Sequence, residues 1–146
     1  MPAHRLLAAL AALVGLLVLG TTAASAQEVQ LFAVLSGGNE VSTNGQAAAG
    51  DPDGSGAAMV SVVAADQLCF AILANNIDPP ALAHIHQAPA GRNGPIVVNL
   101  LVPNSAGCAP GLDPALVESI RRTPSEFYVN VHTGAFPAGA VRGQLF

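Results

Sequence analysis

The sequence predicts an all-β fold, a small Greek-key sandwich or barrel of about seven strands with one short helix. Short apolar segments alternate along the chain with turns rich in Gly, Pro, Asn and Asp, which is typical of antiparallel sheets. The 146 residues include 15 Gly and 11 Pro, and a helical bundle would not tolerate so many. The length favours a single domain.

Seven segments are predicted as strands, because each is largely apolar and ends at a turn signal. Residues 64–67, between the second and third segments, form a predicted hairpin turn, and residues 103–111 form a predicted loop. The predicted strands are 30–35, 57–63, 68–74, 82–87, 96–102, 127–133 and 140–146.

One short helix is predicted between the last loop and the last two strands. Asp113 is placed to cap its first turn, and Pro114 suits its first helical position. Arg121 and Arg122 fall in the last turn, where cations interact favourably with the helix dipole. Pro124 ends the helix, because the residue before a proline disfavours helical backbone.

The N-terminal 26 residues are predicted to be a secretory signal peptide. They combine a charged start at Arg5, an apolar run over 6–19 and a final Ala24-Ser25-Ala26. The alternative, an uncleaved membrane anchor, is disfavoured because 14 apolar residues span a bilayer poorly. Cleavage would leave a domain of residues 27–146 with no membrane span, secreted or periplasmic.

Charge and cysteine content narrow the function further. The formal net charge is −4, so binding of nucleic acid through a basic face is not expected. In an oxidising compartment, Cys69 and Cys108 are expected to form a disulfide, which would stabilise the fold by about 3–4 kcal/mol. The alternatives are two buried free thiols or metal ligation, although the spacing matches no zinc motif.

Three histidines follow the predicted signal peptide, and their spacing indicates a metal site. His84 and His86 flank Ile85, so both imidazoles project from one face of a strand, with Cα atoms about 6–7 Å apart. His132 shares a strand face with Asn130. If the two strands are neighbours, three neutral imidazoles converge, which suits copper or a catalytic-type zinc ion. The alternative is that the histidines only form hydrogen bonds within the fold.

Arg142 lies among apolar residues of the last predicted strand. It could form hydrogen bonds between strands, or it could attract anions to a metal site together with Arg92. Neither a nucleophile elbow nor a phosphate-binding loop is present, so hydrolytic chemistry has little support.

Several ordered motifs together resemble the CHRD domain family, named for chordin. The resemblance covers nearly all of residues 30–146 and implies a secreted immunoglobulin-like or superoxide-dismutase-like β-sandwich. It also strengthens the metal-site hypothesis, with Asn130 and Arg142 as supporting side chains, because the two histidine strands recur together in the family. The His84-Ile85-His86 strand is more distantly similar to the copper strand of copper–zinc superoxide dismutases. The motifs are 35–41 (LSGGNEV), 83–86 (AHIH), 91–98 (GRNGPIVV), 127–133 (FYVNVHT) and 136–145 (FPAGAVRGQL).

Three functions follow from these expectations. The first is a secreted binding module with a three-histidine metal site, copper-type rather than zinc-type, that meets an unidentified extracellular protein or surface. The second is a copper-dependent redox enzyme of the superoxide dismutase type. The third is a metal-free structural or adhesive domain outside the cell.

Overall fold

The computed structural model describes residues 28–100 and 106–146, so the predicted signal peptide lies outside the described residues. Eight strands form one sheet in the order β5-β4-β7-β8-β1-β2-β3-β6, and all neighbours are antiparallel. The all-β prediction with one short helix is therefore confirmed. The strands are β1 (Val29–Ser36), β2 (Ser55–Ala64), β3 (Gln67–Asn75), β4 (Pro80–Gln87), β5 (Ile96–Leu100), β6 (Ala106–Ala109), β7 (Phe127–Thr133) and β8 (Val141–Gln144).

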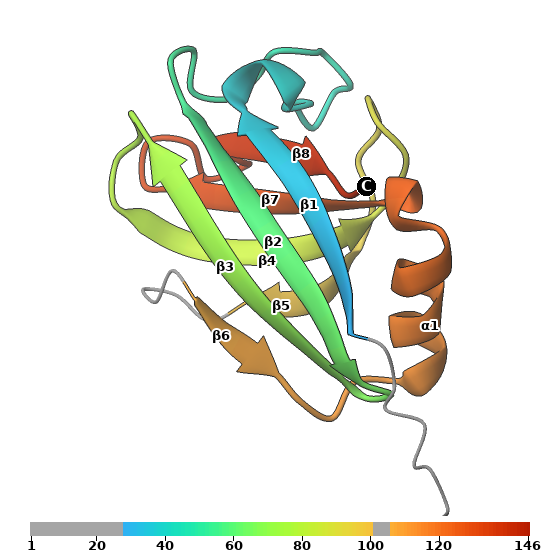
Figure 1. The fold of residues 1–146 in the computed structure, drawn as a ribbon. Helices are drawn as coiled ribbons and strands as arrows, with labels where there is room; N and C mark the ends of the chain where they lie inside the picture. The colour runs from blue at the N-terminus through green and yellow to red at the C-terminus, as the bar shows by residue number, and fades with distance from the viewer. Residues whose placement is uncertain (1–27, 101–105) are drawn as a thin grey trace, which may run out of the picture.

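The sheet curls so that its two halves face each other (Figure 1). Strands β1, β2 and β3 cross in front of β4, β7 and β8, and the apolar core fills the space between these layers. Alternate residues of each strand point into this core, as expected for a sheet buried on one face. Its fully buried members include Val60, Leu68, Ile85, Phe127 and Val129.

Strands β1, β2 and β3 form a meander. The predicted hairpin turn at 64–67 is confirmed, because β2 ends at Ala64 and β3 begins at Gln67. The predicted strand 96–102 is observed as β5 (Ile96–Leu100), and residues 101–102 lie outside the described residues.

The prediction of a loop over residues 103–111 is wrong for residues 106–109. Residues 106–109 form β6, which pairs with the edge of β3. The segment is Ala-Gly-Cys-Ala, with no β-branched or aromatic residue to indicate a strand. Its register places Cys108 directly opposite Cys69, and the predicted disulfide joins them.

The helix α1 (Pro114–Arg122) confirms its predicted ends. The Asp113 carboxylate accepts the Ala115 N–H at 2.9 Å, and Arg121 donates to Glu118 within the last two turns. Val117 and Ile120 are buried against the core. Two short 3-10 turns are present. The first, η1 (Gly37–Asn39), precedes the loop to β2, and the second, η2 (Pro124–Glu126), precedes β7. No helix among residues 28–100 and 106–146 is long and apolar enough to cross a membrane.

The adjacent strands β4, β7 and β8 carry the residues of interest. β7 occupies the predicted range of 127–133, whereas β8 is shorter than the predicted 140–146. The pairing places His84 opposite Asn130, and Asn130 opposite Arg142. Directly paired residues share a face, so these three side chains lie on the same side of the sheet, away from the apolar core.

Candidate metal centre

The three histidines lie together on the outer face of β4 and β7, and each has an exposed fraction of 7–9%. On β4, His84 and His86 flank the core residue Ile85, which the strand's alternation places on the opposite face. His132 lies on β7 opposite Leu82, two pairs along the ladder from the His84–Asn130 pair, and so on the same face. The sequence alone indicates that His84 and His86 share a face of one strand. The pairing of β4 with β7 is what brings His132 to them.

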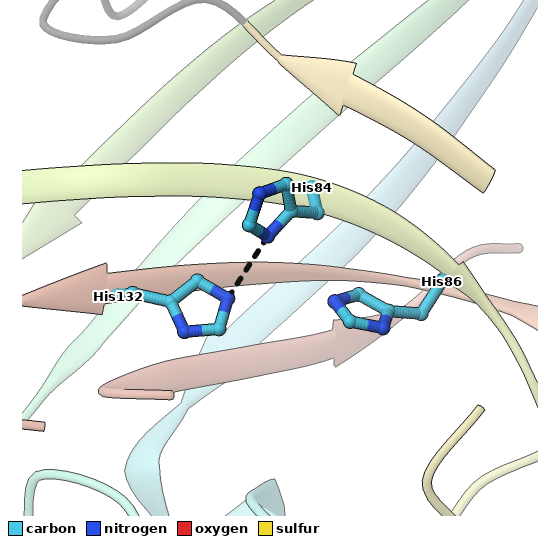
Figure 2. A group of neighbouring side chains, drawn as sticks. All are labelled: His84, His86 and His132. Atoms are coloured by element: carbon cyan, nitrogen blue, oxygen red, sulfur yellow. Dashed lines mark hydrogen bonds between the residues drawn. The ribbon is translucent and has the colours of Figure 1, made fainter. Parts of the chain in front are cut away.

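The ring nitrogens approach one common point, as Figure 2 shows. Nδ1 of His84 lies 3.1 Å from Nε2 of His132, and one nitrogen from each of the three rings lies within 4.8 Å of the others. Three nitrogens bound tetrahedrally to one ion, at bond lengths of about 2.0 Å, would be separated by about 3.3 Å. The group is therefore close to the spacing that a metal ion requires.

Backbone carbonyls fix the tautomers of two of the rings. His86 donates its Nδ1–H to the Gly94 carbonyl at 2.9 Å, and His132 donates its Nδ1–H to the Pro137 carbonyl at 3.1 Å. A carbonyl can only accept, so the lone pair of each ring must be on Nε2. Metal-binding histidines commonly donate their second nitrogen in this way.

The Nε2 atom of His86 is buried and has no hydrogen-bond partner among the described residues. A buried polar atom without a partner is costly, and in native proteins it often marks a functional group. This orphaned lone pair is directed at the place where a shared ion would lie, so the donor set fits a metal.

Electrostatics keep the three rings neutral. Burial, together with the neighbouring His132 and His86, lowers the pKa of His84 to about 4. Burial also lowers the pKa of His86 and of His132, although their bonds to the Gly94 and Pro137 carbonyls oppose that shift. Neutral imidazoles are the form that binds metal, so the lowered pKa values favour metal binding by all three rings.

A family model described as CHRD domain matches residues 31–145. The chain belongs to the CHRD domain family. No curated protein and no solved structure matches it. Within this CHRD domain, the histidine site comes from two of the motifs that carry the resemblance, 83–86 and 127–133.

Arg142, predicted either to bridge strands or to attract anions, is 1% exposed. Its guanidinium donates to the carbonyls of Pro89 and Arg92, at 3.3 and 2.7 Å, and to the side-chain oxygen of Asn93 at 3.3 Å. The side chain thus connects the last strand of the CHRD domain to the loop that follows β4. Arg92 contributes its carbonyl to this contact.

Asn130 is buried beside Glu40, which reaches the same face from the turn after η1. One oxygen of each side chain, Glu40 Oε2 and Asn130 Oδ1, lacks a hydrogen-bond partner among the described residues. Both oxygens lie close to Gly139, where a Cβ would be 2.3 Å from the carboxylate and 2.7 Å from the amide oxygen. The φ of +140° at this position also favours glycine. Burial raises the pKa of Glu40, and the Val41 N–H, the Arg142 guanidinium and the Asn130 side chain oppose that shift in part.

Sequence reasoning missed four contributors to the site. Tyr128 could have been found, because it alternates with Asn130 and His132 and so shares their face. Glu40, Gly94 and Pro137 lie outside the strands, so no periodic pattern indicates where their oxygens lie, although Gly94 and Pro137 are only eight and five residues from the histidines that they bind.

Proposed function

We propose that this CHRD domain is an exported binding module in which His84, His86 and His132 hold one metal ion. The observation that carries the proposal is the convergence of three neutral ring nitrogens, one of which, His86 Nε2, is buried and unpartnered. The Gly94 and Pro137 carbonyls support it, because they orient two of the rings with their lone pairs toward the group.

Copper fits this donor set better than zinc. Divalent copper binds nitrogen ligands more tightly than zinc does, and imidazole suits both metals. Structural zinc sites usually have four protein ligands, whereas the group of three histidines contains no carboxylate or thiolate. We therefore expect copper to displace zinc from the site.

Metal binding requires one proton to move. Without metal, His84 must donate its Nδ1–H to His132, because Nε2 of His132 carries the lone pair. To offer Nδ1 to an ion, His84 takes the tautomer that is protonated on Nε2. The proton can therefore stay on the ring, and affinity should depend little on pH where the histidines are neutral.

Export is the setting that we propose for this site. A signal peptide over residues 1–26 would direct the domain of residues 27–146 to a secreted or periplasmic location. The Cys69–Cys108 disulfide fits an oxidising compartment of this kind. The proposal is limited to binding and does not extend to redox catalysis, because Arg142 uses its donors to hold a loop.

The test is copper binding by residues 27–146 prepared without a histidine tag, since a tag would bind copper itself. We expect one copper ion per chain by elemental analysis and a rise in melting temperature with copper that exceeds the rise with zinc. His84→Ala with His86→Ala should abolish both effects. Asn75→Ala, at an exposed position that ends β3, is the control that should retain them. Equal and negligible copper in the native chain and the double variant would refute the proposal.

A further inference from the structure

We infer that Arg142 and Tyr128 are positioning residues that set the metal affinity of the histidine site by holding His86 in one orientation and one tautomer. The inference rests on the proposed function, and it concerns how strongly the site binds. Neither residue belongs to the group of three ligands.

The burial of Arg142 is the first reason. A guanidinium that is 1% exposed loses its hydration, and a protein normally compensates by pairing it with a carboxylate. Among the described residues, the arginines in ion pairs are Arg121 and Arg122, and Arg142 instead donates to loop acceptors between Pro89 and Asn93. Glu40 attracts this buried charge without forming an ion pair with it, and the guanidinium hydrogen bonds go to the loop that leads to Gly94.

Tyr128 is the second link, because it lies on β7 between the strand of Arg142 and the strand of His86. The guanidinium carbon of Arg142 lies 3.3 Å from the centroid of the Tyr128 ring, which is a cation–π contact. The His86 ring stacks on Tyr128 with centroids 4.8 Å apart and planes 7° apart. Contact with Tyr128 thus restricts the plane in which the His86 ring can lie.

The Gly94 peptide is the third link, because it joins both rings. Its N–H donates to the Tyr128 hydroxyl at 3.3 Å, and its carbonyl accepts the Nδ1–H of His86 at 2.9 Å. The loop passes so close to β4 that a Cβ at position 94 would lie 1.9 Å from the Gln87 carbonyl oxygen. Only glycine allows this approach. The carbonyl that selects the His86 tautomer therefore depends on the position of the loop, to which the hydrogen bonds of Arg142 contribute.

Together, these contacts orient the His86 ring from two directions, by stacking and by a hydrogen bond. If either relaxes, Nε2 is no longer kept toward His84 and His132, and part of the binding free energy is lost in ordering the ring. Residues that orient metal ligands commonly change affinity by about 10–100-fold when they are replaced.

The test uses Arg142→Lys and Tyr128→Phe, with Arg121→Lys as an exposed control. Long-range proton–nitrogen NMR of the metal-free protein reports the His86 tautomer, and competition with a chromophoric chelator reports the copper affinity. We expect native His86 to be protonated on Nδ1. Arg142→Lys should give a mixture of tautomers and copper affinity lower by about 10–100-fold, Tyr128→Phe a smaller loss, and Arg121→Lys no change.

The two readouts separate this inference from the proposed function. A native protein that binds no copper contradicts the proposed function, whereas the metal-free NMR spectra still test how His86 is held. A folded Arg142→Lys variant with the native tautomer and native affinity would overturn the inference. Should Arg142→Lys fail to fold, Tyr128→Phe decides by the same two measurements, and native values for both would then overturn it.

Discussion

Strands β4 and β7 bury side chains on both faces, and the two faces differ completely in chemistry. The inner face presents Ile85 and Val129, each 0% exposed, to the apolar core. The outer face presents His84, His86 and Asn130, which are 2–9% exposed and are surrounded by polar groups. Neighbouring residues of the same strand therefore serve two different environments.

The difference teaches where to look for function. An apolar residue gains free energy from burial alone, at about 25 cal/mol per Å². A buried polar residue loses free energy unless each of its donors and acceptors is paired. The inner face is thus explained by stability, whereas the outer face contains His86 Nε2, Glu40 Oε2 and Asn130 Oδ1 without partners among the described residues. Such exceptions are expected where a site exists for something other than folding.

The largest effect that we expect comes from testing both faces of β4 at adjacent positions. Ile85→Ala should destabilise the metal-free protein by about 2–5 kcal/mol, because it leaves a cavity in the core. His86→Gln should change stability by only about 1 kcal/mol, because glutamine can still donate to the Gly94 carbonyl. Urea unfolding of both variants measures the difference, and equal losses would mean that the two faces do not differ as described.

The second effect concerns the pH dependence of stability, and within β4 it comes from the outer face, because the inner face of this strand carries no titratable side chain. The pKa of His84 is about 4 in the folded protein and near 6.5 when unfolded, so the unfolded chain takes up its proton first. Stability of the metal-free protein should therefore fall as pH drops from 6.5 to 4, by roughly 2–3 kcal/mol from this residue after solvent screening is allowed for. Chemical denaturation across this range measures the slope.

The matched control for the pH effect is His84→Gln, which removes the titrating group. Its stability should vary less with pH between 6.5 and 4 than that of the native chain. An unchanged slope in the variant would show that His84 is not held neutral by its surroundings.

The smallest effect should come from Glu40→Gln, which replaces a buried carboxylate by an amide of similar shape. At pH 7 the substitution should be neutral or stabilising, by up to about 1 kcal/mol, because it removes a buried charge whose pKa burial raises. Because the folded pKa of Glu40 is raised, its contribution falls as pH rises above about 4.5, opposite in sign to that of His84. Thermal unfolding at pH 5 and pH 7 measures both effects, and a marked loss at pH 7 would show that the carboxylate is needed.

The alternation of residue types carries most of what the sequence can reveal here. In β7, Val129 and Val131 alternate with Asn130 and His132, so the two faces can be assigned without a structure. The ends of α1 were also predictable, because Asp113 and Pro114 have strong local preferences. These features depend on residues close together in the chain.

Other features depend on contacts between distant segments. Strand β6 is too short and too poor in β-branched residues to be recognised, and pairing with β3 forms it. The tautomer of His86 depends on Gly94, and the placement of that loop depends on Arg142, which lies 49 to 53 residues further along the chain than its loop contacts. The tautomer of His86 and the position of the loop are therefore determined only when the loop packs against the last strand.

The position of the disulfide has a consequence for proteolysis. The bond between Cys69 and Cys108 encloses β4, β5 and the loop that joins them. A protease that cut this loop would leave one fragment with His84 and His86 and another with His132, still covalently linked. The nicked chain would run as one band in non-reducing electrophoresis and as two bands after reduction. A cleaved domain could therefore keep all three histidines in one molecule.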